Sequence, residues 1–312
     1  MTVGDGILQD RVAVITGGAS GIGEATVRKF LAAGAKIVIG DLNEQAGAAL
    51  VADLCEQGFD QQVRFQPGDV SEEAYVIKLM GIAETEFDGV DIVFNNAGIG
   101  GAIGSILELD VDHWDQTFAV MARGVFLGIK HGGRAMRKTG RGGSIINTAS
   151  IAALSGCGGP LAYSATKAAV VNMTMNAATE LAYLNIRVNA VCPGIIFTDL
   201  MHRGNAEEAG KTVEKIQPST LKGAPEHIAA MVQFLASDES VFVTGTTQVV
   251  DGGYLANGLL GIHPLPGVAK RPDYTGMNYG TTGRGTEIKY LDRTNSSSNG
   301  SDSTNLTERT QE

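Results

Sequence analysis

Cysteine, proline and aromatic residues are scarce in this 312-residue chain, which has three cysteines, eight prolines and one tryptophan, with 6% aromatic residues. The cysteines Cys55, Cys157 and Cys192 are odd in number and widely spaced. That pattern fits neither a disulfide framework nor the ligand spacing of a zinc site. We therefore expect reduced thiols, a cytoplasmic protein and no metal.

Positive charge is also scarce, because 24 lysines and arginines face 34 aspartates and glutamates and leave a formal net charge of -10. Nucleic acids and anionic membranes bind basic surfaces, so we expect neither as a partner. No apolar run approaches the roughly 18 residues that span a bilayer. The first residues, MTVGDGILQD, lack a basic segment followed by a long apolar core. With 43% hydrophobic residues, the chain is expected to close one substantial core.

Short β-rich runs alternate with longer helical patterns in the first 256 residues. Strands are expected at 12–16, 36–41, 63–70, 91–98, 143–150, 186–194 and 246–253. Helices are expected at 25–34, 44–58, 111–137 and 162–183. This alternation is typical of a parallel sheet with right-handed crossovers. It predicts an α/β fold with a doubly wound parallel sheet of about seven strands, in a single domain over residues 1–256.

The composition changes after residue 257, where a segment ending in NSSSNGSDSTN has hardly any apolar residues. We therefore predict a C-terminal extension over 257–312 that is largely disordered towards its end. Three Asn-x-Ser/Thr triplets begin at Asn295, Asn299 and Asn305. A tail of this composition forms such triplets by chance, so we do not expect glycosylation.

A glycine-rich run, TGGASGIG, lies at 16–23 between the first predicted strand and the first helix. In such a turn, backbone N–H groups and the helix N-terminus can approach a pyrophosphate that larger side chains would block. The alternative is an ordinary tight connection. The position in the first βαβ unit favours a dinucleotide site. Its candidate cofactor contacts are Gly17, Ser20, Gly21, Ile22 and Gly23.

Asp41 ends the second predicted strand, 18 residues after Gly23. A carboxylate there can accept both ribose hydroxyls of an adenosine and would repel a 2′-phosphate. The alternative is a solvated aspartate at the end of a strand. However, Leu42, Asn43 and Glu44 include no cation to receive a phosphate. The pattern therefore predicts NAD rather than NADP as the cofactor.

Further motifs follow in order: GDV at 68–70, NNAG at 95–98, YSATK at 163–167 and PGIIFT at 193–198. Together with the glycine run they resemble the short-chain dehydrogenase/reductase family over about residues 9–256. The resemblance implies a Rossmann-type fold that transfers hydride between an alcohol and a nicotinamide. It also implies a homodimer or homotetramer. The many Ala, Gly and Met positions at 111–137 and 162–183 are consistent with packing between subunits.

The resemblance assigns further cofactor contacts. Residues matching Asp69 and Val70 contact the adenine, and the NNAG motif lines the adenosine ribose through Asn95, Ala97 and Gly98. The nicotinamide amide is held by a segment whose matching residues are Pro193, Ile196 and Thr198. For Asn96, a structural hydrogen bond at the end of a strand stays as open as contact with a ligand.

Tyr163 and Lys167 are four positions apart, so on a helix they share one face. A tyrosine can take the proton of a reacting alcohol if a nearby ammonium lowers its pKa. The same ammonium can also reach the nicotinamide ribose, so Tyr163 and Lys167 are expected cofactor contacts as well. Tyr-x-x-x-Lys alone is often a surface pair. Here Ser150 precedes Tyr163 by thirteen residues, the family's spacing for the hydroxyl that binds the substrate oxygen. A serine at the end of a strand can instead cap a turn, and Thr148 and Ser155 could fill similar roles.

One position departs from the family pattern. The family's usual Asn-x-x-Gly-x-Phe stretch, whose asparagine supports a water chain to the lysine, corresponds to MARGVF at 121–126. Met121 cannot donate or accept hydrogen bonds comparably. We therefore predict that this relay is broken or rebuilt, which bears on turnover more than on the fold.

These patterns predict an NAD(H)-dependent oxidoreductase that interconverts a secondary alcohol and its ketone, with Tyr163 as acid/base and Ser150 and Lys167 beside it. The substrate is expected to be small or cyclic and mainly uncharged, because the loops at 155–160 and 199–221 contain no clear carboxylate clamp. The alternative is a catalytically weakened NAD(H)-binding protein that acts as a redox-sensing or interaction module.

Overall fold

The computed structural model describes residues 6–156, 159–198, 201, 207, 217–256, 274–277 and 287–290. The chain divides into two compact units, Met1–Ala256 and Asn257–Glu312. The first unit contains the main sheet and every residue predicted to form the site.

The first unit is built on one sheet of seven parallel strands in the order β3-β2-β1-β4-β5-β6-β7. The strands are β1 Val12–Thr16, β2 Lys36–Asp41, β3 Val63–Pro67, β4 Ile92–Asn95, β5 Gly143–Thr148, β6 Ile186–Pro193 and β7 Thr247–Val250. The direction of winding reverses between β1 and β4, where ligands bind in open α/β sheets. The predicted doubly wound sheet is confirmed.

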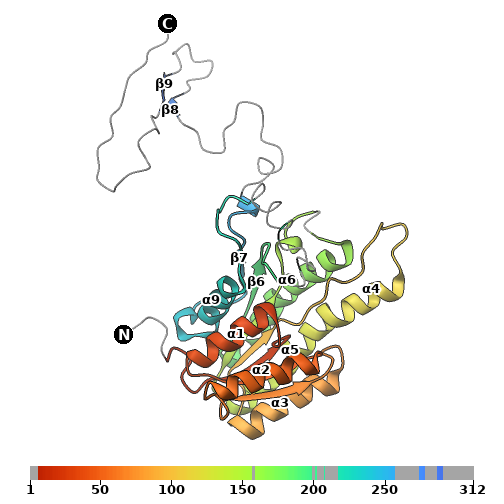
Figure 1. The fold of residues 1–312 in the computed structure, drawn as a ribbon, viewed down its shortest axis with the longest axis vertical. Coiled ribbons are helices and arrows are strands. Elements are labelled where there is room, and N and C mark those ends of the chain that lie inside the picture. Colours follow the sequence, from red (N-terminus) through yellow and green to blue (C-terminus); the bar gives the residue numbers. More distant parts are fainter. Residues whose placement is uncertain are drawn as a thin grey trace. The chain divides into compact units, whose positions relative to one another are not determined.

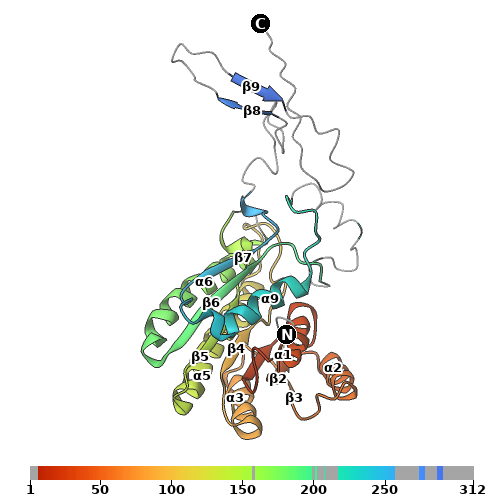
Figure 2. The same ribbon diagram turned by 90° about the vertical axis from the view of Figure 1, so that its left-hand side faces the viewer.

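Both faces of the sheet are buried, which explains why its strands read as continuous apolar runs. In β1, Val12 and Val14 join one hydrophobic cluster, whereas Ala13 and Ile15 join the other. Side chains of α1 Gly21–Ala32, α2 Glu44–Glu56 and α9 Pro225–Ala236 complete the second cluster, and α3 Glu73–Phe87, α5 Gly124–Thr139 and α6 Leu161–Leu181 complete the first. Figures 1 and 2 show these two helical layers on opposite faces of the sheet.

Several elements differ from the expected ones: α1 begins four residues earlier, and β4 and β7 each end three residues earlier. The helix expected at 111–137 consists of α4 Val111–Phe118, a π-helical turn at Ala119–Arg123 and α5. Helices α3 and α9 were not named from the sequence, although their buried residues recur with helical spacing. Strand β3 ends at Pro67 rather than at residue 70. A proline has no backbone N–H with which to extend the ladder.

In the second unit, β8 Tyr274–Met277 and β9 Glu287–Tyr290 form an antiparallel pair. The expected disorder and the three Asn-x-Ser/Thr triplets fall within 291–312, outside the described residues. Among the residues that the structure describes, no helix is both long enough and apolar enough to cross a bilayer. Within the same residues no group of His, Cys, Asp or Glu side chains has the geometry of a metal site.

Candidate active site

The glycine-rich turn lies at the carboxyl end of β1, where two other predicted motifs meet it. Gly17 and Gly21 have positive φ angles of 63° and 52°. A Cβ added to Gly17 would lie 2.8 Å from the Cα of Ala97, and one added to Gly21 would lie 3.2 Å from Cγ2 of Thr198. The turn, the NNAG motif and the PGIIFT segment are therefore in contact.

The start of α1 suits an anionic group. Ser20 is the extended, exposed N-cap residue, and its side chain makes no capping hydrogen bond. A Cβ on Gly23 would collide with the carbonyl oxygen of Gly17. The turn thus depends on glycine and leaves a helix N-terminus open, which is the cradle that the pyrophosphate of a dinucleotide requires.

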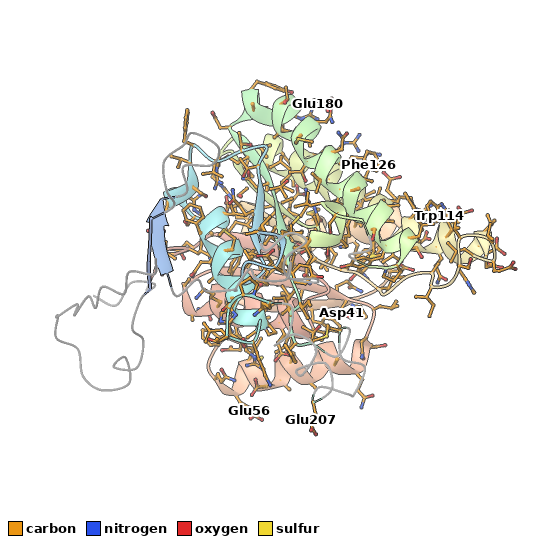
Figure 3. All side chains as sticks on the ribbon, turned by 90° about the horizontal axis from the view of Figure 1, so that it is seen from above. Asp41, Glu56, Trp114, Phe126, Glu180 and Glu207 are labelled. Atoms are coloured by element: carbon orange, nitrogen blue, oxygen red, sulfur yellow. The ribbon has the colours of Figure 1, made fainter. Side chains whose placement is uncertain are left out.

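Asp41, labelled in Figure 3, ends β2. It is hydrogen-bonded to the glycine-rich turn. Its Oδ2 accepts a hydrogen bond from the N–H of Ala19, and its Oδ1 accepts one from the N–H of Asn43, both at 2.9 Å. A carboxylate has about four acceptor positions, so the group still has capacity for hydroxyl donors. The contact with Ala19 fixes the carboxylate against the glycine turn.

Asp69 and Tyr75 form the neighbouring part of this edge. Asp69 Oδ1 accepts the N–H of Ser71 at 2.8 Å, and the Tyr75 hydroxyl donates to the carbonyl of Gln66 at 2.8 Å. Burial, together with the charges of Asp41 and Asp69, raises the pKa of Tyr75. Sequence reasoning missed Tyr75. In the sequence Tyr75 is an aromatic residue in the first turn of α3, a helix that the sequence analysis did not predict.

The two asparagines of the NNAG motif use their side chains within the protein. Asn95 Nδ2 donates to Asn147 Oδ1 at 2.8 Å. Asn96 Nδ2 donates to the carbonyl of Gly17 at 3.1 Å, and its Oδ1 accepts the Thr148 hydroxyl at 3.2 Å. The structural reading that was open for Asn96 is thus the one its side chain adopts. If Asn95 or Asn96 contacts a cofactor, it would do so through its backbone atoms.

Ser150, Tyr163 and Lys167 come together at the carboxyl end of β5. Ser150 is buried, and its Oγ accepts the N–H of Ala152 at 3.1 Å as the cap of a 3-10 turn at Ile151–Ala153. The same side chain interacts with Tyr163 and lowers the pKa of its hydroxyl. Lys167 Nζ lies 5.6 Å from the centre of the Tyr163 ring. Ser150 therefore both caps a turn and contacts the tyrosine.

The two rival hydroxyls have other partners. The Thr148 hydroxyl donates to Asn96, and the Ser155 hydroxyl donates to the carbonyl of Ile151 at 3.3 Å. The carbonyl of Thr148 accepts a hydrogen bond of 2.7 Å from Lys167 Nζ. Of the three candidates, Ser150 is the hydroxyl in contact with Tyr163.

Burial controls the electrostatics of this cluster. It lowers the pKa of Lys167 to about 8, because a desolvated ammonium is disfavoured. It also raises the pKa of Tyr163, an effect that the hydrogen bond from Ser150 partly offsets. We expected Lys167 to lower the pKa of Tyr163. In this structure burial is the largest influence and raises the pKa of Tyr163, and the side chain that lowers it is that of Ser150.

Met121 faces the same lysine. It is fully buried in the π-helical turn. A Cβ added to Gly98 would lie 3.7 Å from Met121 Sδ and 3.8 Å from Lys167 Nζ. The thioether and the ammonium therefore flank the last glycine of the NNAG motif.

Comparison with known proteins agrees with this arrangement. The family described as Enoyl-(Acyl carrier protein) reductase matches residues 17–255. The crystal structure of levodione reductase superposes with a TM-score of 0.75 at 35% identity and covers 80% of this chain and 98% of that one. The chain belongs to the short-chain dehydrogenase/reductase family. The resemblance read from the motifs is confirmed.

Relatives of this short-chain dehydrogenase/reductase include two bacterial dehydrogenases. 3beta-hydroxysteroid dehydrogenase 2 of Eggerthella lenta is 40% identical over 253 residues, which cover 80% of this chain and 96% of that protein. Cis-4-hydroxycyclohexanecarboxylate dehydrogenase of Sinomonas cyclohexanicum is 40% identical over 247 residues, covering 79% and 97% respectively. Family membership makes the chain an oxidoreductase and implies a nicotinamide cofactor, NAD or NADP.

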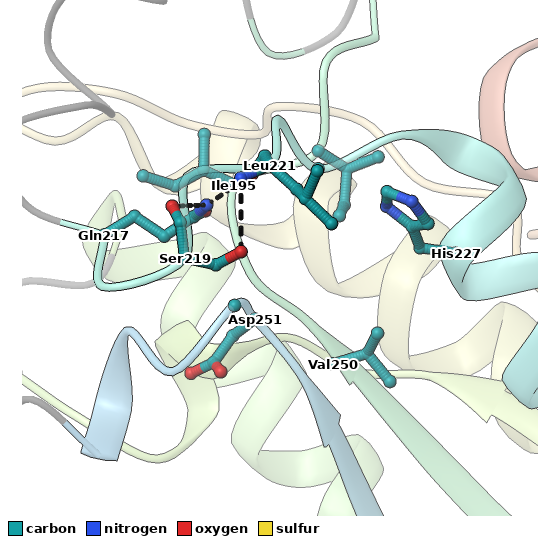
Figure 4. Close-up of a pocket in the computed structure, with 10 residues that line it drawn as sticks. Ile195, Gln217, Ser219, Leu221, His227, Val250 and Asp251 are labelled. Atoms are coloured by element: carbon teal, nitrogen blue, oxygen red, sulfur yellow. Dashed lines mark hydrogen bonds between the residues drawn. The ribbon is translucent and has the colours of Figure 1, made fainter. Parts of the chain in front are cut away.

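A cavity of about 200 Å³ adjoins the PGIIFT segment (Figure 4). It is lined by Ile195 and Ile196, by the 217–223 loop, by His227 and by the end of β7 at Val250–Gly252. Gln217 Nε2 donates to the carbonyls of Ser219 and Leu221 at 3.0 and 2.7 Å. These bonds shape the 217–223 loop, whose Gly223 forms a β-bridge with Ile196.

Part of the predicted substrate cover lies outside the described residues, namely 157–158 and all of 199–216 except Met201 and Glu207. The N–H of Met201 donates to the carbonyl of Thr198 at 2.9 Å. Met201 of this loop is therefore held next to Thr198, the last residue of the predicted nicotinamide segment.

Proposed function

We propose that this protein interconverts a secondary alcohol and its ketone with NAD(H). The observation that carries the proposal is the meeting of Ser150, Tyr163 and Lys167 at the edge of the sheet that also holds the glycine turn and Asp41. The three relatives are named for a hydroxysteroid, for levodione and for a hydroxycyclohexanecarboxylate. These names favour a cyclic substrate.

Each residue of the cluster has a distinct role in this proposal. A bound nicotinamide supplies the hydride acceptor or donor. The Tyr163 hydroxyl takes the proton of the alcohol, or returns it to the ketone. The Ser150 hydroxyl donates a hydrogen bond to the substrate oxygen and orients it. The ammonium of Lys167 stabilises the tyrosinate.

The cofactor would be held along the carboxyl edge of the sheet. The glycine turn would bind the pyrophosphate, and Asp41 would accept the adenosine ribose hydroxyls. Asp69 and Val70 would lie at the adenine, and Ile196 and Thr198 at the nicotinamide amide. NAD is favoured over NADP because a 2′-phosphate would meet the carboxylate of Asp41 with no cation in the residues that follow it.

We also propose that the protein forms a homodimer or homotetramer in the cytoplasm. A groove between α5 and α6 is lined by Phe126, Met173 and Tyr183 together with basic residues of α5. The side chains of Phe126 and Tyr183 are 49% and 76% exposed. Figure 3 shows Phe126 and Glu180 along the outer side of these helices. Apolar surface of this kind is consistent with a subunit interface.

The proposed cytoplasmic location is supported by the free thiols at Cys55 and Cys192, which suit a reducing compartment.

The test is NADH formation by the purified protein with a panel of cyclic and steroid alcohols. Tyr163→Phe should reduce turnover at least on the order of a hundredfold, because it removes the proton-transferring group and leaves the ring in place. NADH affinity, followed by fluorescence, should be retained. Tyr254→Phe, at a partly exposed tyrosine after β7, is the matched control and should behave as wild type. A Tyr163→Phe variant that keeps the wild-type rate would remove Tyr163 from the mechanism.

A second function is favoured by one observation, the burial of Met121 against Gly98 beside Lys167. A thioether at this place relays protons poorly, so the protein would bind NAD(H) and signal redox state to a partner. Wild-type protein that binds NADH but turns over no alcohol or ketone in the panel would support this function instead.

A further inference from the structure

Tyr75 is a buried aromatic residue at the edge of the sheet where the cofactor would bind. It lies in the first turn of α3 and is 9% exposed. Its hydroxyl donates to the carbonyl of Gln66 in β3 at 2.8 Å, and a Cβ added to Gly40 in β2 would lie 2.8 Å from the same hydroxyl oxygen. The side chain therefore reaches back from α3 to the ends of two neighbouring strands.

The ring of Tyr75 covers Gly68, which together with Asp69 forms the corner that follows β3. A Cβ added to Gly68 would collide with the ring carbons Cδ2 and Cε2. The N–H of Gly68 donates to the carbonyl of Asp41 at 2.9 Å, so the corner is also fastened to the end of β2. The ring and the backbone of Gly68 thus pack as closely as the absence of a side chain allows.

Asp69 has one carboxylate oxygen to offer a ligand. Its Oδ1 accepts the N–H of Ser71 at 2.8 Å, whereas no donor among the residues that the structure describes reaches its Oδ2. Pro67 pairs with Asp41 in the β2–β3 ladder, and Asp69 follows two residues later. The unpartnered oxygen is therefore suited to accept the amino group of an adenine whose ribose is bound by Asp41.

The corner has few supports besides Tyr75. Strand β3 is the outermost strand of the sheet, so among the described strands only β2 holds it. Burial and the charges of Asp41 and Asp69 raise the pKa of Tyr75, so its hydroxyl stays protonated and remains a donor to Gln66. Because a hydrogen bond weakens steeply when its groups move out of line, a shift of the corner would cost the contact with adenine.

We propose that Tyr75 is a positioning residue for adenine recognition, whose ring and hydroxyl hold the Gly68–Asp69 corner where Asp69 accepts the adenine amino group. The proposal rests on the proposed function for the placement of the ribose at Asp41 and of the adenine at Asp69. It does not depend on which alcohol is oxidised, or on whether turnover occurs.

The experiment compares NADH with its deamino analogue, in which hypoxanthine replaces adenine and the amino group is absent. Fluorescence titration gives both dissociation constants for each protein. The wild type should bind NADH on the order of tenfold more tightly, the scale of one hydrogen bond to a charged group. Tyr75→Leu, which removes the ring and the hydroxyl, should lower this ratio to about one. Tyr75→Phe, which removes only the hydroxyl, should give an intermediate ratio of about three.

Phe87→Leu is the matched control, because Phe87 is a buried aromatic residue, 8% exposed, at the opposite end of the same helix. It should lower Tm as Tyr75→Leu does but keep the wild-type ratio. If Phe87→Leu also loses the ratio, or if Tyr75→Leu keeps it, the proposal is wrong. It is equally wrong if the wild type binds the two cofactors with the same affinity. If Tyr75→Leu does not fold, Tyr75→Phe decides by the same criteria.

The same measurements separate this proposal from the proposed function. The expected ratios in a protein that turns over no alcohol would refute the proposed catalysis and leave the role of Tyr75 standing. An active wild type without a preference for adenine would refute the role of Tyr75 alone. If NADPH binds more tightly than NADH, the comparison is made with NADPH and its deamino analogue, and only the preference assigned to Asp41 is refuted.

Discussion

Two charged side chains, Asp41 and Lys167, lie at different ends of the candidate site and have unlike surroundings. Asp41 is partly exposed and accepts backbone N–H groups from Ala19 and Asn43. Lys167 is 3% exposed and donates to one carbonyl, that of Thr148. Solvent and backbone dipoles stabilise the first charge, whereas burial disfavours the second. We therefore expect substitutions at Asp41 to change cofactor preference, and substitutions at Lys167 to change the pH dependence of stability.

At Asp41 we predict that the wild-type protein binds NADH more tightly than NADPH, because the carboxylate repels a 2′-phosphate. Asp41→Ala should reduce this preference, mainly by improving NADPH binding. Fluorescence titration with both cofactors measures the effect. Glu56→Ala, at an exposed glutamate directed away from the molecule in Figure 3, should leave the preference unchanged. Tighter binding of NADPH by the wild type would refute the assignment of Asp41.

At Lys167 we predict that Lys167→Met abolishes turnover but stabilises the fold. The pKa of Lys167 is about 8 in the folded protein, against 10.5 for a lysine in water, so below pH 8 the protein carries a buried ammonium that methionine would avoid. At pH 7 the free energy of unfolding of Lys167→Met should exceed that of the wild type by on the order of 2 kcal/mol.

The stability difference between the wild type and Lys167→Met should depend on pH. As pH rises from about 8 to 10.5, the folded wild type loses the lysine proton before the unfolded chain does, and its stability rises relative to Lys167→Met. The difference in Tm between the two proteins should therefore shrink over this range. Thermal unfolding at pH 7 and pH 10 measures it. Lys78→Met, on the exposed side of α3, should show no such change. A destabilised Lys167→Met at pH 7 would mean that the ammonium is better compensated than its contacts indicate.

At the scale of elements, the π-helical turn at Ala119–Arg123 joins α4 to α5 and carries Met121 towards Lys167. Such turns widen the helix locally and often occur at functional sites. The following residue, Gly124, packs closely on Val70, since an added Cβ would lie 3.1 Å from Val70 Cγ2. The turn therefore links the predicted adenine end of the site to the lysine.

For this turn we predict that Met121→Asn raises the rate of alcohol oxidation. An amide can hold a water between the turn and Lys167, whereas the thioether cannot. The increase should be up to the order of tenfold, since proton transfer by a positioned group contributes more than this in total. Met121→Leu, which keeps the volume and apolar character, should stay at the wild-type rate or below. Equal rates in the Met121→Asn variant and the wild type, with folding intact, would show that proton relay does not limit turnover.

At the scale of the whole molecule, the two units are built differently. The sheet and both hydrophobic clusters lie within Met1–Ala256, and the β8–β9 pair of the second unit bonds only to itself among the described strands. We predict that deletion of residues from 270 onward leaves Tm and NADH affinity nearly unchanged, because this segment has too few apolar residues to join a core. A large fall in Tm on truncation would show that the segment is docked on the first unit.

The fold and the membership of the site follow from local features of the sequence. Alternating apolar runs such as VAVIT pack on both faces of a parallel sheet, and the confirmed sheet places the motifs after β1, β2, β4, β5 and β6 at one edge. Glycine at positions 17, 21 and 23 is required by backbone geometry that a local motif already specifies. These inferences needed only the order of motifs and the periodicity of the chain.

Other properties were decided by contacts between residues far apart in the chain. The π-helical turn at Ala119–Arg123 depends on how separate elements pack. So does the position of Tyr75 beside Asp41. The pKa of Tyr163 is the clearest case. Its spacing from Lys167 predicted a lowered value, but burial raises it. Spacing along one helix shows which charges are neighbours, whereas desolvation depends on everything that surrounds them, and only the tertiary structure determines that.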